Sequence, residues 1–144
     1  MKLAIFLVGI PASGKTTQRN AMAGTPYVSM DEIRKELTGS ISDQTRNKEV
    51  SELAFKRWAD LLEANPMVIL DNTNYNRKNR KKFLQIAKSH GAICQAFVFF
   101  VTLEEAKRRN ANREVVVPEH VIERMYNNFE YPTAEEGFDV IQRF

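Results

Sequence analysis

Hydrophobic residues fall into short runs along the chain, and these runs alternate with longer segments of mixed polarity. The run from Leu3 to Val8 is almost continuously apolar, as is typical of a strand buried on both faces of a parallel sheet. The runs have the length of strands and are bounded by glycine, proline or polar residues. The pattern therefore predicts five strands, at residues 2–8, 27–29, 67–71, 92–101 and 138–141.

Between these runs, apolar residues recur every three to four positions, and this spacing predicts amphipathic helices. The longest helical stripe runs from Val50 to Leu62 and ends before Asn65-Pro66. Trp58 belongs to this stripe, so we expect it in the core rather than on the surface as a platform for a base. The other helices are predicted near residues 15–23, 31–37, 77–90, 103–112 and 121–129.

Strands that alternate with helices indicate an α/β domain with a parallel sheet and right-handed crossover connections. In such sheets, ligands bind at the carboxyl ends of the strands. The polar motifs of this chain all follow predicted strands, at residues 9–16, at Asp31, at residues 71–74 and after Val101. We therefore expect these motifs to converge on one crevice, although they are far apart in sequence.

The segment Gly9-Ile10-Pro11-Ala12-Ser13-Gly14-Lys15-Thr16 follows the first predicted strand and precedes a helix. It matches G-x-x-x-x-G-K-[ST], the phosphate-binding P-loop, in the context that this motif requires. The two glycines let successive N–H groups point at one centre, and the helix adds its positive end. Lys15 can reach the β- and γ-phosphates, and the Thr16 hydroxyl suits Mg²⁺. The motif predicts binding of ATP or GTP, with contacts from Gly9, Ala12, Ser13, Gly14, Lys15, Thr16 and Thr17.

Two aspartates at predicted strand ends could serve phosphoryl transfer, which needs a metal ligand and a group near the attacking oxygen. Asp71, at the end of the third strand, is the expected second ligand of Mg²⁺, although such a residue can also cap a turn. Asp31 lies past the second strand, where an acceptor hydroxyl could approach, and its alternative role is the N-cap of a helix. Arg34 shares a helical face with Asp31 and could hold an anionic acceptor.

Arg109 and Arg113 are four residues apart on a predicted helix, so both side chains can point the same way. The segment from Glu114 to Pro118 follows them and interrupts the helical pattern. Cationic side chains beside a mobile segment suit a lid that closes over phosphates. A salt-bridged surface helix is the alternative for each arginine, including the neighbouring Arg108.

A dense basic cluster follows the third strand and consists of Arg77, Lys78, Arg80, Lys81 and Lys82. Such a cluster is usually the solvated face of a helix, and binding of nucleic acid is the alternative. The net charge of +3 is compatible with an anionic partner without requiring one.

The length of 144 residues fits one domain. The single cysteine, Cys94, lies in an apolar run, so we expect a buried thiol and a reducing compartment. No run approaches the roughly 18 apolar residues that indicate a membrane-spanning helix. These features favour a cytoplasmic protein with no membrane segment.

Taken together, these residues resemble the P-loop 5′-hydroxyl polynucleotide kinases, especially the kinase module of phage and animal polynucleotide kinase-phosphatases. The resemblance covers nearly the whole chain. It implies a three-layer P-loop kinase fold over residues 1–144, with a mainly parallel five-stranded sheet in the order 2-3-1-4-5 and a helical lid. The matching segments are residues 9–16, Ser29-Met30-Asp31 with Arg34, Leu70-Asp71-Asn72-Thr73-Asn74, Thr102-Leu103-Glu104-Glu105-Ala106 with Arg109 and Arg113, and Tyr131-Pro132-Thr133-Ala134-Glu135-Glu136-Gly137-Phe138.

The resemblance also implies roles for individual residues. Asp31 would be the general base on the 5′-hydroxyl, and Arg34 would contact the phosphate of the acceptor. Lys15 and Arg113 would engage the donor phosphates. The full expectation is Lys15, Asp31 and Arg113 for catalysis, Arg109 with the P-loop residues for the nucleotide, Arg34, Thr73 and Asn74 for the acceptor, and Thr16 and Asp71 for Mg²⁺.

The expected activity is ATP-dependent transfer of the γ-phosphoryl group to the 5′-hydroxyl of DNA or RNA. Met30 stands where the family often has an arginine, and the segment between Arg34 and Trp58 matches only loosely. A kinase of the same mechanism that acts on a nucleoside, a modified base or another small hydroxyl compound is therefore an alternative. A third interpretation is a nucleotide-dependent binding or switch module without an acceptor. Such a module would not need both Asp31 and Arg34 on the acceptor side.

Overall fold

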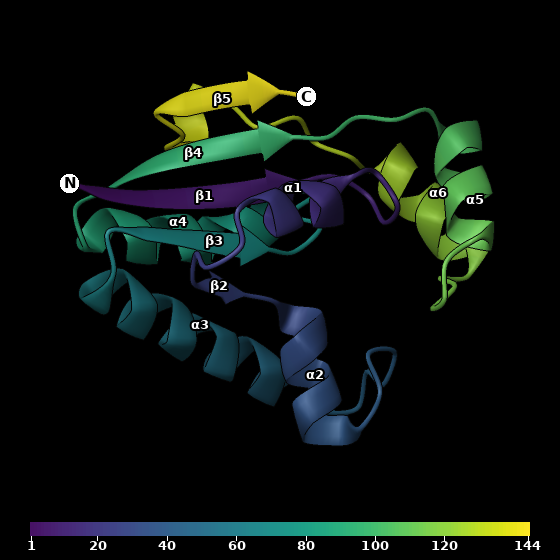
Figure 1. Cartoon of the computed structure of the whole chain (residues 1–144), viewed down its shortest axis with the longest axis horizontal. Coiled ribbons are helices and arrows are strands. Elements are labelled where there is room, and N and C mark those ends of the chain that lie inside the picture. The colour runs from purple at the N-terminus through teal and green to yellow at the C-terminus, as the bar shows by residue number, and fades with distance from the viewer.

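The computed structural model describes residues 1–144 and contains one five-stranded sheet (Figure 1). Every strand pairing is parallel, and the strand order is β2-β3-β1-β4-β5. The predicted α/β class and the order 2-3-1-4-5 are confirmed. The strands are β1 (Lys2–Val8), β2 (Tyr27–Val28), β3 (Met67–Asp71), β4 (Ala92–Val98) and β5 (Val140–Arg143).

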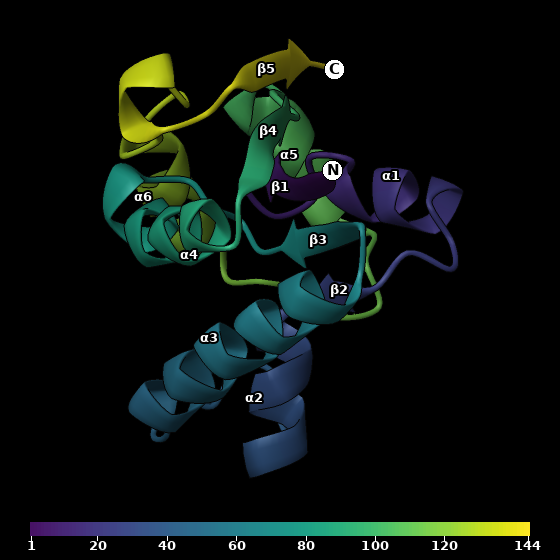
Figure 2. The ribbon, with the colours of Figure 1, turned by 90° about the vertical axis from the view of Figure 1, so that its left-hand side faces the viewer.

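Helices cover both faces of this sheet. α3 and α4 pack on one face, α1 lies on the other, and α5 and α6 lie together beyond the carboxyl ends of the strands (Figures 1 and 2). None of the helices has both the length and the apolar composition needed to cross a membrane. The helices are α1 (Lys15–Ala21), α2 (Met30–Thr38), α3 (Asn47–Ala64), α4 (Arg77–Ser89), α5 (Leu103–Ala111) and α6 (Glu119–Asn127), with a short 3₁₀ helix, η1, at Ala134–Glu136.

The central strand β1 supplies side chains to both layers of the core. Ala4, Phe6 and Val8 point toward α3 and α4, into a cluster of 19 buried residues. Ile5 and Leu7 point to the opposite face, where a smaller cluster lies under α1. Because alternate side chains of a strand point to opposite faces, a continuous apolar run is what a strand covered on both sides requires.

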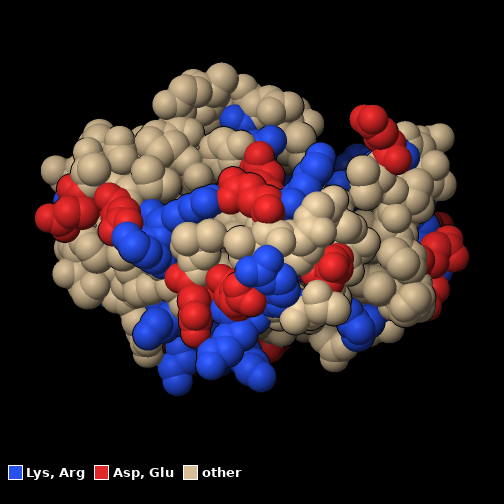
Figure 3. Space-filling view, turned by 90° about the horizontal axis from the view of Figure 1, so that it is seen from below, with Lys and Arg blue, Asp and Glu red and all other residues tan.

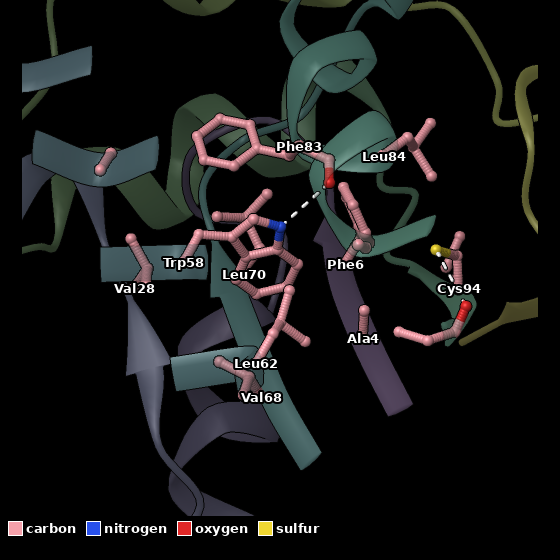
Figure 4. Close-up of a cluster of buried hydrophobic side chains, with 14 of the residues drawn as sticks. Ala4, Phe6, Val28, Trp58, Leu62, Val68, Leu70, Phe83, Leu84 and Cys94 are labelled. Carbon is pink, nitrogen blue, oxygen red and sulfur yellow. Dashed lines mark hydrogen bonds between the residues drawn. The ribbon is translucent and has the colours of Figure 1, made fainter. Parts of the chain in front are cut away.

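Trp58 lies at the centre of the larger cluster, as predicted from the helical stripe (Figure 4). Its indole N–H donates a hydrogen bond to the carbonyl of Phe83 at 3.0 Å. Its ring contacts the Phe6 ring edge-on, with 5.5 Å between the ring centroids. The polar N–H is therefore satisfied inside the core. Cys94 is also buried, as predicted, and burial raises the pKa of its thiol to about 11.

The first helix ends earlier than predicted. α1 stops at Ala21 rather than Ala23, because the Met22 N–H bonds to the carbonyl of Arg19 and the chain then turns at Gly24, where φ is +90°.

The fourth strand stops at Val98 rather than Val101. Phe100 turns outward and is 44% exposed, while Val101 packs against α5 and α6 instead of continuing the ladder.

The last strand begins at Val140, two residues later than predicted. Phe138 is buried in the main core, and the Asp139 carboxylate accepts a hydrogen bond from the Cys94 N–H at 2.8 Å. The Asp139 N–H also donates to the Cys94 carbonyl at 2.8 Å, so Asp139 joins the chain to β4 just before the paired residues of the strand begin at Val140.

Candidate active site

The loop between β1 and α1 turns tightly through left-handed backbone conformations. Ala12 and Gly14 have φ values of +66° and +108°, in the left-handed region. A Cβ atom on Gly9 would lie 2.4 Å from Ser13 Oγ and 2.7 Å from the Phe99 carbonyl, so the close approach requires glycine. Ser13 Oγ is buried without a hydrogen-bond partner. A buried hydroxyl that lacks a partner suits a loop built to receive an anion.

Lys15 is folded back into this loop. Its Nζ donates to the carbonyls of Gly9 at 2.6 Å and Ile10 at 3.0 Å. The pKa of Lys15 is lowered to about 8, chiefly by burial; the charge of Asp71 opposes this shift, that of Arg113 adds to it, and that of Asp31 opposes it. Three charged groups predicted to share a crevice therefore act on one ammonium, as expected if their segments converge.

Asp71 lies at the end of β3 with its side chain 13% exposed. Arg19 of α1 donates to Asp71 Oδ2 at 2.9 Å. Burial raises the pKa of Asp71, while Arg19 and Lys15 oppose that rise. Thr16, beside Lys15, is exposed. A hydroxyl and a carboxylate are both hard oxygen ligands, so Thr16 and Asp71 fit the needs of Mg²⁺.

Sequence reasoning missed Arg19, although a signal was present. Arg19 is four residues beyond Lys15 and so lies on the same helical face. Its guanidinium also contacts Glu32 Oε2 at 3.3 Å and lies 4.5 Å from the ring centroid of Tyr27. Arg19 is therefore held over the strand end that carries Asp71.

Asp31 and Arg34 lie together on α2. Ser29, not Asp31, is the N-cap, because Ser29 Oγ accepts from the Glu32 N–H at 3.3 Å. The Asp31 side chain is left 69% exposed, and Arg34 Nη1 donates to its Oδ1 at 3.0 Å. Arg34 itself is only 11% exposed. The carboxylate is therefore open to an incoming molecule, with a partly buried guanidinium beside it.

A second residue that the sequence did not reveal orients Arg34. Asn47 Oδ1, at the start of α3, accepts from Arg34 Nη2 at 3.3 Å and from Arg34 Nε at 3.4 Å. Asn47 Nδ2 in turn donates to Gln44 Oε1 at 2.8 Å. The loosely matching segment after α2 thus contributes directly to the surroundings of Arg34.

The loop after Asp71 joins the other parts of the site. Asn72 Oδ1 accepts from the Met30 N–H at 3.0 Å, which ties the loop to α2. The carbonyl of Thr73 accepts from the Gly9 N–H at 2.9 Å, which ties it to the P-loop. Segments from three parts of the sequence are therefore bonded to one another at the carboxyl edge of the sheet.

Asn74 lies differently from the expectation for an acceptor-binding residue. Its side chain is buried, and Nδ2 donates to the Leu7 carbonyl at 2.8 Å, while Oδ1 has no partner. Its φ of +49° is a left-handed conformation that asparagine tolerates. The structure thus directs the Asn74 side chain into the fold, whereas Thr73 stays partly exposed.

Arg80 corrects the interpretation of the basic cluster as a solvated face. It is fully buried, with Nε and Nη2 donating to the Glu136 carboxylate at 2.8 and 3.0 Å. Nη1 donates to the carbonyls of Asn74 and Glu130, each at 2.8 Å. Arg80 therefore holds the loop after β3 from behind, through a paired and hydrogen-bonded charge.

The predicted lid corresponds to α5, α6 and the segment between them. Arg108 and Arg109 both pair with Glu105, and these pairs lie at the surface. The buried Asn110 side chain bonds to both the N–H and the carbonyl of Val117, which fixes the base of the segment. Arg113 is exposed, and its charge acts on Lys15. Of the lid arginines, Arg113 is the one the structure relates to the P-loop.

Comparison with known proteins assigns the chain to a family. A protein-family model described as an AAA domain matches residues 5–132.

Among curated proteins, the chain is similar to a protein of Autographa californica nuclear polyhedrosis virus proposed to be a bifunctional polynucleotide kinase/RNA ligase, with 24% identity over 90% of this chain and 22% of the relative. It is similar to the bifunctional polynucleotide phosphatase/kinase of Schizosaccharomyces pombe, with 24% identity over 96% of this chain and 32% of the relative. It is also similar to the L-seryl-tRNA(Sec) kinase of Methanococcus maripaludis, with 23% identity over 96% of this chain and 56% of the relative. The chain thus spans between a fifth and a little over half of these relatives.

Solved structures share the fold. A chain of the Pnkp1/Rnl/Hen1 RNA repair complex has a TM-score of 0.79 and 22% identity over 96% of this chain and 46% of that chain. Chaetomium thermophilum Kti12 in complex with ADP-AlF3 has a TM-score of 0.71 and 17% identity, over 98% of this chain and 88% of that chain. A gluconokinase from Sinorhizobium meliloti has a TM-score of 0.65 and 18% identity, over 98% of this chain and 81% of that chain. With the P-loop at the end of β1 and the family match over most of its length, the chain belongs to the AAA domain family, and its sequence is similar to those of polynucleotide kinases.

Proposed function

We propose that the domain transfers the γ-phosphoryl group of ATP to the 5′-hydroxyl of a polynucleotide. The observation that carries this proposal is the pair formed by Asp31 and Arg34. An exposed carboxylate and a partly buried guanidinium, 3.0 Å apart, provide a proton acceptor beside an anion-binding group. A 5′-hydroxyl with a phosphate on the same nucleotide presents the matching pair of groups.

The donor nucleotide occupies the P-loop. Backbone N–H groups of the loop and the start of α1 surround its phosphates, and Lys15 exchanges its bonds to loop carbonyls for bonds to phosphate oxygens. Arg113 approaches the same phosphates from the lid. Arg109 can join it once Arg109 is released from Glu105. Such an arginine stabilises charge that develops during transfer.

Thr16 and Asp71 are the residues that would hold Mg²⁺. When bound, the ion neutralises charge on the β- and γ-phosphates. Arg19 bonds one oxygen of the Asp71 carboxylate, Oδ2, so its positive charge opposes binding of the ion there, and Arg19 also has Glu32 as a partner.

The 5′-oxygen forms a bond to the γ-phosphorus while the bond from that phosphorus to the β–γ bridging oxygen breaks, and ADP leaves. The hydroxyl proton passes to the Asp31 carboxylate. Arg34 holds the acceptor phosphate, and Thr73 borders the acceptor from the loop after β3. Asn74 supports this loop from inside the fold.

The test compares acceptors that differ in one phosphate at a time. We expect kcat/KM to be much higher for a nucleoside 3′-monophosphate and a short oligonucleotide than for the bare nucleoside, and to fall with salt for the phosphorylated acceptors. Arg34→Ala should narrow this gap, because it removes a charge-assisted contact. Arg57→Ala, which removes an exposed arginine paired with Glu36, is the control. A bare nucleoside that performs equally well at every salt concentration would refute the polynucleotide acceptor.

A second candidate is a kinase of the same mechanism that acts on another hydroxyl. It is favoured by the similarity to the L-seryl-tRNA(Sec) kinase of M. maripaludis, whose length this chain covers most fully among the curated relatives described above. The same assay separates the two, because such an enzyme would use a hydroxyl compound without a neighbouring phosphate and would be insensitive to Arg34→Ala.

A further inference from the structure

An open groove lies where the loop after β3 enters α4. It is lined by Tyr75, Asn76, Asn127, Asn128, Phe129 and Glu130, and its volume is about 420 Å³. We propose that this groove and the exposed lysines of α4 bind the nucleotides of a single-stranded acceptor that follow the reacting one. The inference rests on the proposed function and names a path that the substrate takes away from Asp31.

The position of the groove connects it to the active site. It begins at Tyr75, four residues beyond Asp71, and the intervening loop bonds to both α2 and the P-loop. The Glu130 N–H donates to the Tyr75 carbonyl at 2.7 Å, which joins the two walls of the groove. A chain whose 5′ end lies at Asp31 can therefore leave the crevice along this loop.

The groove offers hydrogen-bonding groups suited to base edges. Asn76 uses its Oδ1 to cap α4, and Asn128 uses its Nδ2 to bond the Arg124 carbonyl, so each has its other amide atom free. Asn127 makes no side-chain hydrogen bond within the chain, and it is exposed. Amide groups pair with the donors and acceptors of nucleobases.

Aromatic rings lie beside these amides. Tyr75 and Phe129 line the groove, and the 44% exposed Tyr131 has its ring centroid 6.5 Å from that of Phe129. Exposed aromatic rings stack with successive bases and tolerate any sequence. Glu130 adds a negative charge to the groove, which disfavours a phosphate there and favours the neutral base.

The phosphates have a separate binding surface. Lys78, Lys81 and Lys82 are exposed on the outward side of α4, and none has a carboxylate within 4.0 Å. Lys88 on the same helix is paired, since its Nζ lies 2.8 Å from Asp139. Figure 3 shows Lys and Arg side chains gathered at the lower margin of the molecule, on the side where α4 lies. Lys82 Nζ also lies 5.9 Å from the centroid of the Phe55 ring. Lysines without carboxylate partners, on the helix that begins at a groove containing aromatic rings and amides, match the alternation of phosphates and bases in a single strand.

Equilibrium binding tests this surface without relying on activity. A 12-nucleotide single strand with a 5′-hydroxyl and a 3′ fluorophore is titrated at several salt concentrations with wild type and with Lys78→Gln/Lys81→Gln/Lys82→Gln. The salt slope is the slope of the logarithm of the binding constant against the logarithm of the salt concentration. Each lost phosphate contact makes this slope shallower by about 0.7, so the slope of the triple variant should be shallower by roughly 2. Lys88→Gln, the control, should behave as wild type. DNA and RNA strands are measured separately, because the shared phosphate and base chemistry allows either.

Turnover with acceptors of increasing length tests the groove. For wild type, kcat/KM should rise from the nucleoside 3′-monophosphate to a four-nucleotide acceptor. Tyr75→Ala should reduce this gain at least about fivefold, the lower end of the effect of losing one base-stacking ring, and leave the 3′-monophosphate unaffected. Phe144→Leu, after β5 and 47% exposed, controls for the loss of a partly exposed aromatic ring elsewhere.

The outcomes separate this proposal from the proposed function. If wild type phosphorylates 5′-hydroxyl acceptors, yet length has no effect or both variants match their controls, the path is overturned and the kinase function stands. If wild type neither binds the strand nor phosphorylates any 5′-hydroxyl acceptor, both are overturned. The path is supported if the triple lysine variant has a shallower salt slope and Tyr75→Ala loses the increase of kcat/KM with acceptor length.

Discussion

Arg19 and Asp71 form an ion pair that joins α1 to the end of β3, with Arg19 Nη1 2.9 Å from Asp71 Oδ2. The carboxylate that would bind Mg²⁺ is thus already bonded to a cation of the protein. Binding of the ion and of Arg19 at Asp71 should therefore compete. Glu32, which also contacts Arg19, offers the displaced guanidinium a second partner.

Arg19→Gln should lower the Mg²⁺ concentration needed for half-maximal activity, by about fivefold for a partly exposed pair worth roughly 1 kcal/mol. All variants are assayed at the same pH, because burial raises the pKa of Asp71. Asp71→Asn should raise the requirement strongly, and Arg57→Gln should not change it. An unchanged requirement in Arg19→Gln would mean that Asp71 does not bind the ion in competition with Arg19.

Asp31→Asn should reduce kcat by about 10² to 10⁴, the usual contribution of a general base. The amide oxygen can still accept a hydrogen bond from Arg34, so the geometry is preserved while the ability to take a proton is lost. Affinity for nucleotide, measured by calorimetry, should change little. Asp60→Asn, at a surface pair with Lys56, is the control. A defect confined to nucleotide binding would place Asp31 on the donor side instead.

The parts of the site that the sequence predicted are those encoded by neighbouring residues. The P-loop is one such segment, because the strand, the glycines and Lys15 are contiguous. The pairing of Arg19 with Asp71 spans 52 positions, and no local pattern reveals it. Asn47 beside Arg34 is a similar case, since the segment between the two helices has no regular spacing.

For Arg80, as for the helical face of Arg19, a signal was present in the sequence. Arg80 shares its helical face with Phe83, Leu84 and Ala87, which are three, four and seven residues further on and are buried. The basic cluster was interpreted as a unit, and the density of charge concealed this spacing. Only Glu136, 56 positions away, makes burial of the arginine possible.

Nucleotide affinity should depend on the protonation of Lys15. In the free protein the pKa of Lys15 is about 8, lowered chiefly by burial, and nucleotide phosphates will raise it. The protonated form therefore binds better, so affinity should be constant below about pH 8 and fall as pH rises above it, by up to tenfold per unit. Calorimetry with MgADP between about pH 7 and pH 10 measures this. Lys15→Gln should bind weakly with no such decline, whereas a flat wild-type profile would contradict the shifted pKa.

The Arg80 and Glu136 pair should contribute strongly to folding stability. Arg80→Met leaves the Glu136 carboxylate, 6% exposed, without its partner and removes the donor to the Asn74 and Glu130 carbonyls. Breaking a buried pair from one side costs roughly 3–5 kcal/mol, whereas an exposed pair contributes about 0–1 kcal/mol. Arg77→Met, which removes an exposed arginine 3.8 Å from the same carboxylate, is the matched control.

Urea unfolding of Arg80→Met, Arg77→Met and the double variant Arg80→Met/Glu136→Gln measures this contribution. The double variant should recover part of the stability lost in Arg80→Met, because no unpaired charge then stays buried. Its recovery should be incomplete, since the two carbonyls that Arg80 bonds are left without donors. If Arg80→Met and Arg77→Met cost the same, the loop after β3 is held by its bonds to Leu7, Gly9 and Met30 rather than by Arg80.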